Sequence, residues 1–287
     1  MKDYFGYKGK RVVITGAASG MAQAAARMLV DLGAEIYALD VKEVTVPVKK
    51  YIKTDLLHKD AIDAAVKQIP NNIYALFNCA GAIPPKFTNV EVTTVNFVGH
   101  RHLTERLLPK MNDGGAIAFI SSQAGFNWRS KLAEIKPLLD TRSFEEGRAW
   151  LDAHEAEVTD GYRLSKLCIC AYAKMNCKEL AKRLIRINCI LPGPSQTGMM
   201  PVFTEDSVIL GGEVIGGKDL KDIIESTLAA SLPLCGRNAQ PEEQAMPLVF
   251  LNSDMARFIT GELLLVDYGY VASVEVGQTP DTFEYMT

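Results

Sequence analysis

The sequence predicts an α/β fold with one doubly wound parallel sheet of about seven strands and helices on both of its faces. Short apolar runs rich in β-branched and aromatic residues alternate with longer amphipathic segments. A glycine-rich turn follows the first apolar run. No linker, internal repeat or low-complexity tract interrupts the alternation. We therefore expect residues 1–287 to form a single domain.

Each element of this fold is predicted from its length and its hydrophobic period. Runs too short for helices predict buried strands at 11–15, 35–40, 74–81, 116–122, 184–193 and 261–269. Apolar residues at helical spacing predict helices at 21–33, 59–69, 91–111 and 162–183. Repetition of strand, helix and strand implies right-handed crossovers, which place helices on both sides of the sheet.

The segment 128–161 interrupts the alternation just before the helix at 162–183. Its apolar residues fit one or two short amphipathic helices. They are Leu132, Ile135, Leu138, Leu139, Phe144, Trp150 and Leu151. We expect a surface insertion, a cover for the active site or a contact between subunits.

Composition excludes several classes of protein. The chain has 48% hydrophobic and 23% charged residues and a formal net charge of −3, which is typical of a globular protein. Lys and Arg are scattered, so we expect no nucleic-acid or anionic-lipid partner. The first residues lack a signal-peptide core, and no run of about 18 apolar residues occurs. We expect a cytoplasmic protein that does not span a membrane.

The cysteines and histidines do not predict a metal site. The six cysteines lie mostly in apolar segments, so we expect reduced thiols rather than disulfides. No spacing of Cys and His matches a zinc site. His100 and His102 are two residues apart, which places them on different faces of a helix.

The segment VVITGAASGMA (12–22) ends a predicted strand and begins a helix. Gly16 and Gly20 permit a sharp turn and close approach of the backbone to a pyrophosphate, and Ala22 is a third small residue. A helix N-terminus at this point favours phosphate charge. Together these features predict a Rossmann-type dinucleotide site.

Asp40 indicates which dinucleotide is preferred. It ends the second predicted strand, 24 residues after Gly16, where such units place an acid near the adenosine ribose. A carboxylate accepts hydrogen bonds from ribose hydroxyls and would repel a 2′-phosphate. This favours NAD over NADP, although Lys42 lies close by and an Asp at a strand end is also a common turn former.

Tyr162 and Lys166 lie one helical turn apart in the predicted helix at 162–183. A tyrosine of pKa about 10 needs nearby positive charge to act as an acid or base near neutrality, and Lys166 could supply it. The same spacing recurs at Tyr4 and Lys8, so the pair alone is not decisive.

An ordered set of motifs settles the matter. TGAASGMA (15–22), NCAG (78–81), VNFVG with Asn96, ISSQAG (120–125), the Tyr162–Lys166 pair and LPGPSQT (191–197) follow one another along the chain. In type and order this set resembles the short-chain dehydrogenase/reductase family over nearly the whole chain. The resemblance implies a dinucleotide-dependent oxidoreductase that interconverts a secondary alcohol and a ketone.

The resemblance also implies roles for individual residues. Tyr162 would exchange the proton, Lys166 would support it and bind the nicotinamide ribose, and Ser122 would hydrogen-bond the substrate oxygen. Ser121 would face the other way along the strand. Asn96 would hold a water that connects the lysine to solvent.

The implied cofactor-binding residues lie in the same motifs. They are Gly16, Ser19, Gly20, Met21, Asp40, Asp55, Leu56, Asn78, Ala80, Gly81, Tyr162, Lys166, Pro192, Gly193 and Thr197. The chain departs from the family pattern at Ala22, at Cys79 and in DYG (267–269). Cys79 stands near the adenosine side, so it would loosen cofactor contacts without affecting the chemistry.

The 40 residues between Ser122 and Tyr162 are more than most of the family has. A similar helical insertion is found in bacterial 3α-hydroxysteroid dehydrogenase/carbonyl reductases, where it blocks the usual tetramer contact and leaves a dimer. We expect a homodimer or homotetramer.

The segment 197–226 corresponds to the family's substrate loop, and its apolar residues favour an apolar substrate. A hydroxysteroid or bile acid fits best. The alternatives are another cyclic or aromatic alcohol, or a nucleotide-sensing regulator without turnover, for which a proton donor would be unnecessary.

Overall fold

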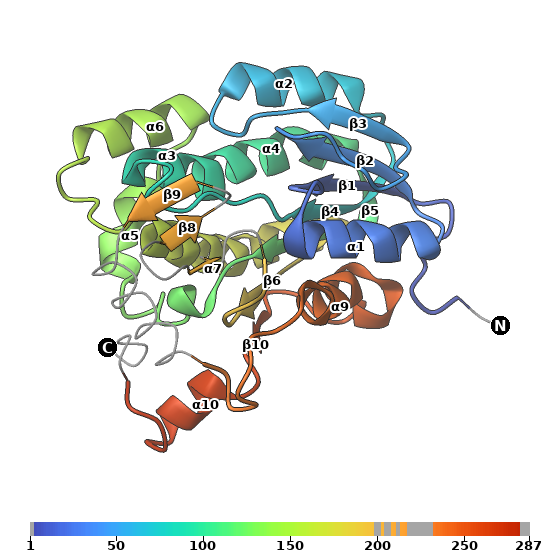
Figure 1. Cartoon of the computed structure of the whole chain (residues 1–287). Helices are drawn as coiled ribbons and strands as arrows, with labels where there is room; N and C mark the ends of the chain where they lie inside the picture. Colours follow the sequence, from blue (N-terminus) through green and yellow to red (C-terminus); the bar gives the residue numbers. More distant parts are fainter. Residues whose placement is uncertain (1–2, 198–201, 204–207, 211–212, 217–231, 282–287) are drawn as a thin grey trace.

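The computed structural model describes residues 3–197, 202–203, 208–210, 213–216 and 232–281. In these residues seven parallel strands form one sheet in the order β10-β6-β5-β4-β1-β2-β3 (Figure 1). The strands are β1 (Arg11–Thr15), β2 (Glu35–Asp40), β3 (Lys50–Lys53), β4 (Ile73–Asn78), β5 (Met111–Ile120), β6 (Arg186–Pro192) and β10 (Leu263–Val266). The predicted doubly wound sheet is confirmed.

Helices cover both faces of the sheet, and each face has its own apolar core. On one face α1 (Gly20–Asp31) packs beside α9 (Pro241–Asn252) (Figure 1). The other face is covered by α2 (Lys59–Gln68), α4 (His100–Leu107) and α7 (Gly161–Leu180). Alternate residues of β1 enter the two cores, because successive side chains of a strand point to opposite faces.

The single helix predicted at 91–111 is wrong in detail. The chain forms α3 (Asn89–Thr93), a π-helical segment (Thr94–Gly99), α4 and a 3-10 turn (Leu108–Lys110). Thr88 and Glu91 form a capping box that starts α3 at Asn89, two residues before the predicted start at residue 91. The widened turn contains Asn96, whose side chain is bonded to the neighbouring backbone. Hydrophobic period alone does not distinguish a short π-helical turn from an α-helix.

Three further elements differ from the prediction. Strand β3 lies at the edge of the sheet and buries only Ile52 of its four residues, so it has no apolar run. Strand β5 begins at Met111 rather than at residue 116, because it continues through Gly114 and Gly115, which resemble a turn in the sequence. A short helix, α10 (Tyr270–Glu275), follows β10.

The insertion 128–161 forms two helices, as predicted: α5 (Leu132–Leu139) and α6 (Phe144–Ala153). Ile135, Leu138 and Leu151 are buried in the same core as α7. The buried Arg101 of α4 donates hydrogen bonds to the carbonyls of Thr141 (2.9 Å) and Ser143 (2.9 Å). The insertion therefore packs on the outer side of α4 and α7.

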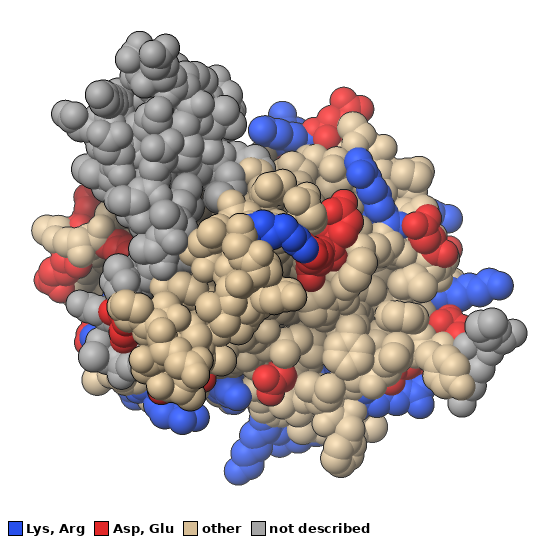
Figure 2. Space-filling model, turned by 60° about the horizontal axis from the view of Figure 1, so that its bottom comes forward, with Lys and Arg blue, Asp and Glu red and all other residues tan. Residues whose placement is uncertain are grey.

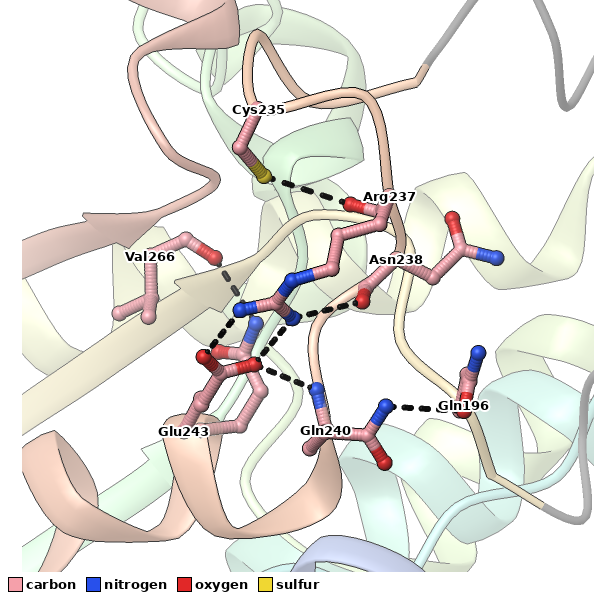
Figure 3. A network of polar contacts seen from close by, with 8 residues as sticks. Gln196, Cys235, Arg237, Asn238, Gln240, Glu243 and Val266 are labelled. Atoms are coloured by element: carbon pink, nitrogen blue, oxygen red, sulfur yellow. Dashed lines mark hydrogen bonds and ion pairs between the residues drawn. The ribbon is translucent and has the colours of Figure 1, made fainter.

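The predicted substrate loop 197–226 lies for the most part outside the described residues. Its described strands β7 (Val202–Phe203), β8 (Val208–Leu210) and β9 (Glu213–Gly216) form a small antiparallel sheet. The two chain segments that flank this loop are joined to each other (Figure 3). The Gln240 Nε2 atom donates to Gln196 Oε1 at 2.9 Å.

The same junction is stabilised by an ion pair at the start of α9. Arg237 Nη1 lies 2.7 Å from Glu243 Oε2, and Nη2 lies 2.6 Å from Oε1, a bidentate arrangement that Figure 3 shows. Glu243 Oε2 also accepts from the backbone N–H of Gln240 at 2.7 Å. These bonds hold the segment 237–240 against the start of α9.

Candidate active site

The four residues of the predicted catalytic set lie in three segments: Ser122 follows β5 at the carboxyl end of the sheet, Asn96 lies in the π-helical segment, and Tyr162 and Lys166 lie in α7. Ser122 follows β5 and its hydroxyl accepts from the Ala124 N–H at 3.2 Å, which starts a 3-10 turn (Gln123–Gly125). The Ser122 side chain lies close enough to the Tyr162 phenol to lower the pKa of that phenol. Lys166 Nζ lies 5.3 Å from the centre of the Tyr162 ring.

Ser121 faces away from this cluster, as expected for adjacent residues of a strand. Its hydroxyl donates to the Lys166 carbonyl at 2.9 Å and lies 3.2 Å from Cys170 Sγ. Ser121 therefore holds α7 against the end of β5, whereas Ser122 is directed to the phenol of Tyr162. The two serines have different surroundings and different uses.

Lys166 is held in a buried position. Its Nζ donates to the carbonyl of Ile120 at 3.0 Å, and the residue is 5% exposed. Burial lowers the pKa of Lys166 to about 8. A Cβ on Gly125 would lie 2.6 Å from the Lys166 carbonyl oxygen, so a glycine lets the turn after Ser122 pack on α7.

The pKa of Tyr162 is raised in the protein, whereas the sequence predicted that the positive charge of Lys166 would favour the phenolate. Desolvation raises the pKa of Tyr162, the hydrogen bond from Ser122 opposes this, and Asp160 adds to the increase. Lys166 Nζ lies 5.3 Å from the centre of the ring, and burial outweighs the contribution that lowers the pKa of the phenol. The protein alone thus favours the neutral tyrosine.

Asn96 lies in the π-helical segment and is 1% exposed. Its amide pairs with the backbone of Ala82, accepting from N at 2.7 Å and donating to O at 3.0 Å. It also donates to Ser165 Oγ at 3.2 Å, and Ser165 donates to the Tyr162 carbonyl at 2.6 Å. Asn96 thereby joins the chain after β4 to the first turn of α7.

The glycine-rich turn has the geometry that a phosphate site requires. Gly16 has a φ of +78°, and a Cβ on it would lie 2.8 Å from Ala80 Cα, so only glycine fits. Ser19 precedes α1 without a side-chain capping bond, which leaves the first N–H groups of the helix near Gly20 and Met21 without a side-chain acceptor. Thr197 lies over Gly20, at 3.5 Å from the position of a Cβ there.

Asp40 lies beside this turn. Its Oδ2 accepts from the N–H of Ala18 and its Oδ1 from the N–H of Lys42, both at 2.9 Å. The carboxylate is therefore fixed next to the glycine-rich turn. Asp55 is half-exposed after β3 and accepts from the N–H of Leu57 at 2.9 Å, while Leu56 is buried.

Two buried polar atoms near the strand ends have no hydrogen-bond partner among the described residues. They are Asn78 Oδ1 and Gln123 Oε1. Asn78 ends β4, just before Ala80 and Gly81, and its Nδ2 donates to Thr104 at 3.0 Å. Gln123 Oε1 lies near Gly193, the residue after Pro192 at the end of β6.

These observations fit a dinucleotide, because an uncapped helix N-terminus, a fixed acid and unpaired polar atoms follow the carboxyl ends of neighbouring strands.

Thr15 was not predicted to be a site residue, although it begins the glycine motif. Its hydroxyl accepts from the N–H groups of Cys79 (2.8 Å) and Ala80 (3.0 Å). His100 is a second residue beside the site that the sequence pattern did not predict. Its partner Thr15 is 85 residues away along the chain, so no local spacing connects the two.

All six cysteines are unpaired, as predicted. In the part of the chain that the structure describes, no group of three or more His, Cys, Asp and Glu side chains could hold a metal ion. Within the same residues no helix has the length and apolar character needed to cross a bilayer.

Comparison with known proteins gives consistent matches over most of the chain. A family model described as short chain dehydrogenase matches residues 10–133, and one described as Enoyl-(Acyl carrier protein) reductase matches 152–271. Coniferyl-alcohol dehydrogenase of Pseudomonas sp. strain HR199 is 30% identical over 265 residues, which cover 92% of this chain and 97% of the relative.

Two further matches are hydroxysteroid dehydrogenases. The 3-alpha-hydroxysteroid dehydrogenase/carbonyl reductase of Comamonas testosteroni is 25% identical over 90% of this chain and 95% of its own. The 3-alpha-hydroxysteroid dehydrogenase of Pseudomonas sp. B-0831, solved with NADH, has a TM-score of 0.74 at 21% identity. That alignment covers 94% of this chain and 100% of the solved one, and it supports the fold. From its sheet order, its clustered Ser122, Tyr162 and Lys166, and these matches, the chain belongs to the short-chain dehydrogenase/reductase family of oxidoreductases.

Proposed function

We propose that the protein is an NAD(H)-dependent oxidoreductase that interconverts an alcohol and a carbonyl compound on an apolar cyclic substrate. The observation that carries the proposal is the convergence of three side chains: Lys166 Nζ lies 5.3 Å from the centre of the Tyr162 ring, and the Ser122 hydroxyl lies close enough to the phenol to lower its pKa. A phenol and a serine hydroxyl that point to each other can both bind one substrate oxygen.

In this reaction Tyr162 accepts the proton of the substrate hydroxyl during oxidation and returns it during reduction. Ser122 donates a hydrogen bond to the same oxygen and fixes its position. Lys166, oriented by the Ile120 carbonyl, stabilises negative charge on the phenolate. Asn96 holds the start of α7 through Ser165, and we propose that it also holds the water that connects Lys166 to solvent.

The cofactor would supply hydride transfer and, when oxidised, a positive charge that opposes the raised pKa of Tyr162. We propose that the α1 N-terminus and the turn of Gly16, Ser19, Gly20 and Met21 bind its pyrophosphate. Asp55, Leu56, Asn78, Ala80 and Gly81 would border the adenosine half. Pro192, Gly193 and Thr197 would border the nicotinamide.

We propose NAD as the preferred cofactor because of Asp40. Its carboxylate is fixed by two backbone N–H groups beside the glycine-rich turn, and a bound 2′-phosphate there would be repelled. The NADH present in the solved 3-alpha-hydroxysteroid dehydrogenase supports this choice.

For the substrate we propose a hydroxysteroid or bile acid, supported by two hydroxysteroid dehydrogenases among the matches. The second candidate is an aromatic alcohol, which the 30% identity to a coniferyl-alcohol dehydrogenase favours. A role as a nucleotide-sensing regulator is less well supported, because such a protein has no need of the Tyr162 proton donor.

We further propose that residues 1–287 act as one cytoplasmic domain that forms a homodimer or homotetramer. Met246, Met255 and Phe258 are exposed apolar side chains on or just after α9, close in sequence to the edge strand β10. On the face shown in Figure 2, Lys/Arg and Asp/Glu are interspersed and most of the described surface is uncharged. This supports a small-molecule partner more than a nucleic acid or a membrane.

The test is to follow NADH absorbance with NAD or NADP and a panel of alcohols. The panel contains 3-, 7-, 12- and 17-hydroxysteroids, a bile acid, coniferyl alcohol and simple cyclic alcohols. We expect NAD-linked oxidation of at least one hydroxysteroid. Turnover of coniferyl alcohol alone would favour the second candidate, and dinucleotide binding without turnover of any alcohol would favour the regulator.

A further inference from the structure

We propose that His100 is a positioning residue that connects the glycine-rich turn to the segment carrying Asn96. His100 begins α4 and is 2% exposed. Its Nδ1 lies 3.0 Å from the carbonyl oxygen of Asn96, and its Nε2 lies 2.9 Å from Thr15 Oγ1. One imidazole ring thus joins β1 of the proposed cofactor site to the π-helical segment of the proposed catalytic site. The inference rests on the proposed function of these two sites.

The partners of the ring determine its tautomer. A carbonyl oxygen only accepts hydrogen bonds, so Nδ1 carries the proton and donates to Asn96. Nε2 is then an acceptor, and the hydroxyl of Thr15 donates to it. The other acceptor near this hydroxyl, the Phe77 carbonyl, is farther away at 3.5 Å.

The Thr15 hydroxyl extends this chain of hydrogen bonds, and the donors along it all point toward His100 and Asn96. Its oxygen accepts from the N–H groups of Cys79 and Ala80 while its proton goes to His100. The single donor and both lone pairs of the hydroxyl are therefore used. The result is a polarised chain from the backbone of NCAG (78–81) to the Asn96 carbonyl.

The surroundings keep the ring neutral and in place. Burial lowers the pKa of His100 to about 4, and the charge of Lys166 adds to this effect, while the bond to Asn96 opposes it. The ring packs edge-to-face on Phe119 with 6.3 Å between centroids. A neutral imidazole can donate at one nitrogen and accept at the other, which this chain requires.

The chain extends to the proposed proton donor. From Asn96 it passes to Ser165 and then to the carbonyl of Tyr162 in the first turn of α7. Loss of His100 would leave the Asn96 carbonyl and the Thr15 hydroxyl without their buried partners. The glycine-rich turn and the first turn of α7 would then be less strictly aligned, which affects both dinucleotide binding and proton transfer.

The first test measures the tautomer in the unmodified protein and uses a variant only to assign the signal. Nitrogen-15 NMR of histidine-labelled protein, with His100 assigned by comparison with His100→Gln, should show the tautomer protonated at Nδ1 at neutral pH. A ring protonated at Nε2, or at both nitrogens, would overturn the proposed chain.

The second test compares two buried histidines of the same helix. His102 is 8% exposed, and its Nε2 bonds to Asp63 at 3.1 Å, so it serves as the matched control. We expect His100→Leu to raise the NAD dissociation constant about tenfold and to lower kcat, whereas His102→Leu changes both less than about twofold. Partial recovery is expected in His100→Gln, whose amide can donate and accept.

Equal effects of the two leucine variants on NAD affinity and kcat would reduce His100 to a structural residue. Binding is measured by calorimetry on protein that unfolds cooperatively, so it does not depend on the substrate. If the wild-type protein binds no dinucleotide, the proposed function fails, and this outcome is distinct from an unaffected His100→Leu variant.

The third test is a double-mutant cycle between Thr15→Val and His100→Leu. Each substitution breaks the same chain, so the effect of the pair on NAD affinity should be smaller than the product of the single effects. Fully independent effects would contradict the link between the two residues. Thr15→Ser keeps the hydroxyl and should retain near wild-type affinity.

Discussion

The Nζ atom of Lys166 lies 5.3 Å from the centre of the Tyr162 ring while it donates a 3.0 Å hydrogen bond to the carbonyl of Ile120. The lysine is therefore oriented by the end of β5. This arrangement leaves the phenol oxygen available to Ser122 and to a substrate. The following predictions depend on it and on the packing around it.

Replacement of Tyr162 by Phe should abolish most of the activity. The variant keeps the ring that packs beside Lys166 and loses only the proton donor, so we expect kcat to fall by about 10³-fold, with unchanged secondary structure. Tyr172→Phe is the matched control on the same helix, because Tyr172 packs against Phe97 and Phe119 in the core. A Tyr162→Phe variant with most of its activity would remove the mechanism.

Replacement of Asp40 by Asn should change cofactor preference. The amide removes the charge that opposes a 2′-phosphate while it keeps an acceptor for the N–H of Ala18. We expect the ratio of kcat/KM for NADP to that for NAD to rise about tenfold or more. The exposed Asp31 at the end of α1 provides the control Asp31→Asn, which should leave the ratio unchanged. An unchanged ratio in Asp40→Asn would remove the argument for NAD.

Stability should fall in acid because His100 is buried in its neutral form. Its pKa is about 4 in the folded protein and 6.5 as the ordinary value, so the unfolded chain binds the extra proton between these values. The stabilisation is present above about pH 6.5 and is lost as the pH falls toward 4, with a magnitude on the order of 3 kcal/mol.

Urea unfolding of wild-type protein and of His100→Gln at several pH values measures this contribution. The difference between the two curves should decrease steadily from pH 6.5 to pH 4. A difference that does not change over this window would show that the ring titrates as it does in the unfolded chain.

Loss of Arg101 should loosen the insertion. Arg101 is 2% exposed and donates to the carbonyls of Thr141 and Ser143 between α5 and α6. We expect Arg101→Leu to lower the free energy of unfolding by about 2–4 kcal/mol, because two part-buried carbonyls lose a charged, buried donor. Arg106→Leu is the control, because Arg106 is exposed and pairs with Asp63 at the surface. It should lower the free energy of unfolding by less than about 1 kcal/mol.

Proteolysis gives an independent measure of the same effect. The segment between α5 and α6 should be cleaved faster in Arg101→Leu than in Arg106→Leu under native conditions. Equal rates of cleavage would indicate that the apolar contacts of Ile135 and Leu138 suffice to hold the insertion.

Most strands could be predicted because their signal is local. The predicted ranges 11–15 and 35–40 coincide with β1 and β2, since both strands are buried on two faces and have an uninterrupted apolar run in their interior. Strand β3 could not be predicted, because only Ile52 is buried at the sheet edge. The π-helical turn at Thr94–Gly99 was missed because the hydrophobic period does not distinguish it from an α-helix, and the pairing of Asn96 with Ala82 lies outside the local pattern.

The sequence by itself determined the fold class, the order of the motifs and the family, because these depend on hydrophobic period and on residue types at fixed spacing. It also named Ser122, Tyr162, Lys166 and Asn96 as a set. Only the tertiary structure decided what each of these residues contacts. His100 is bonded to Thr15, 85 residues away along the chain, and Arg101 is bonded to carbonyls 40 and 42 residues away. Contacts of this kind depend on how the strands and helices pack, which no local pattern records.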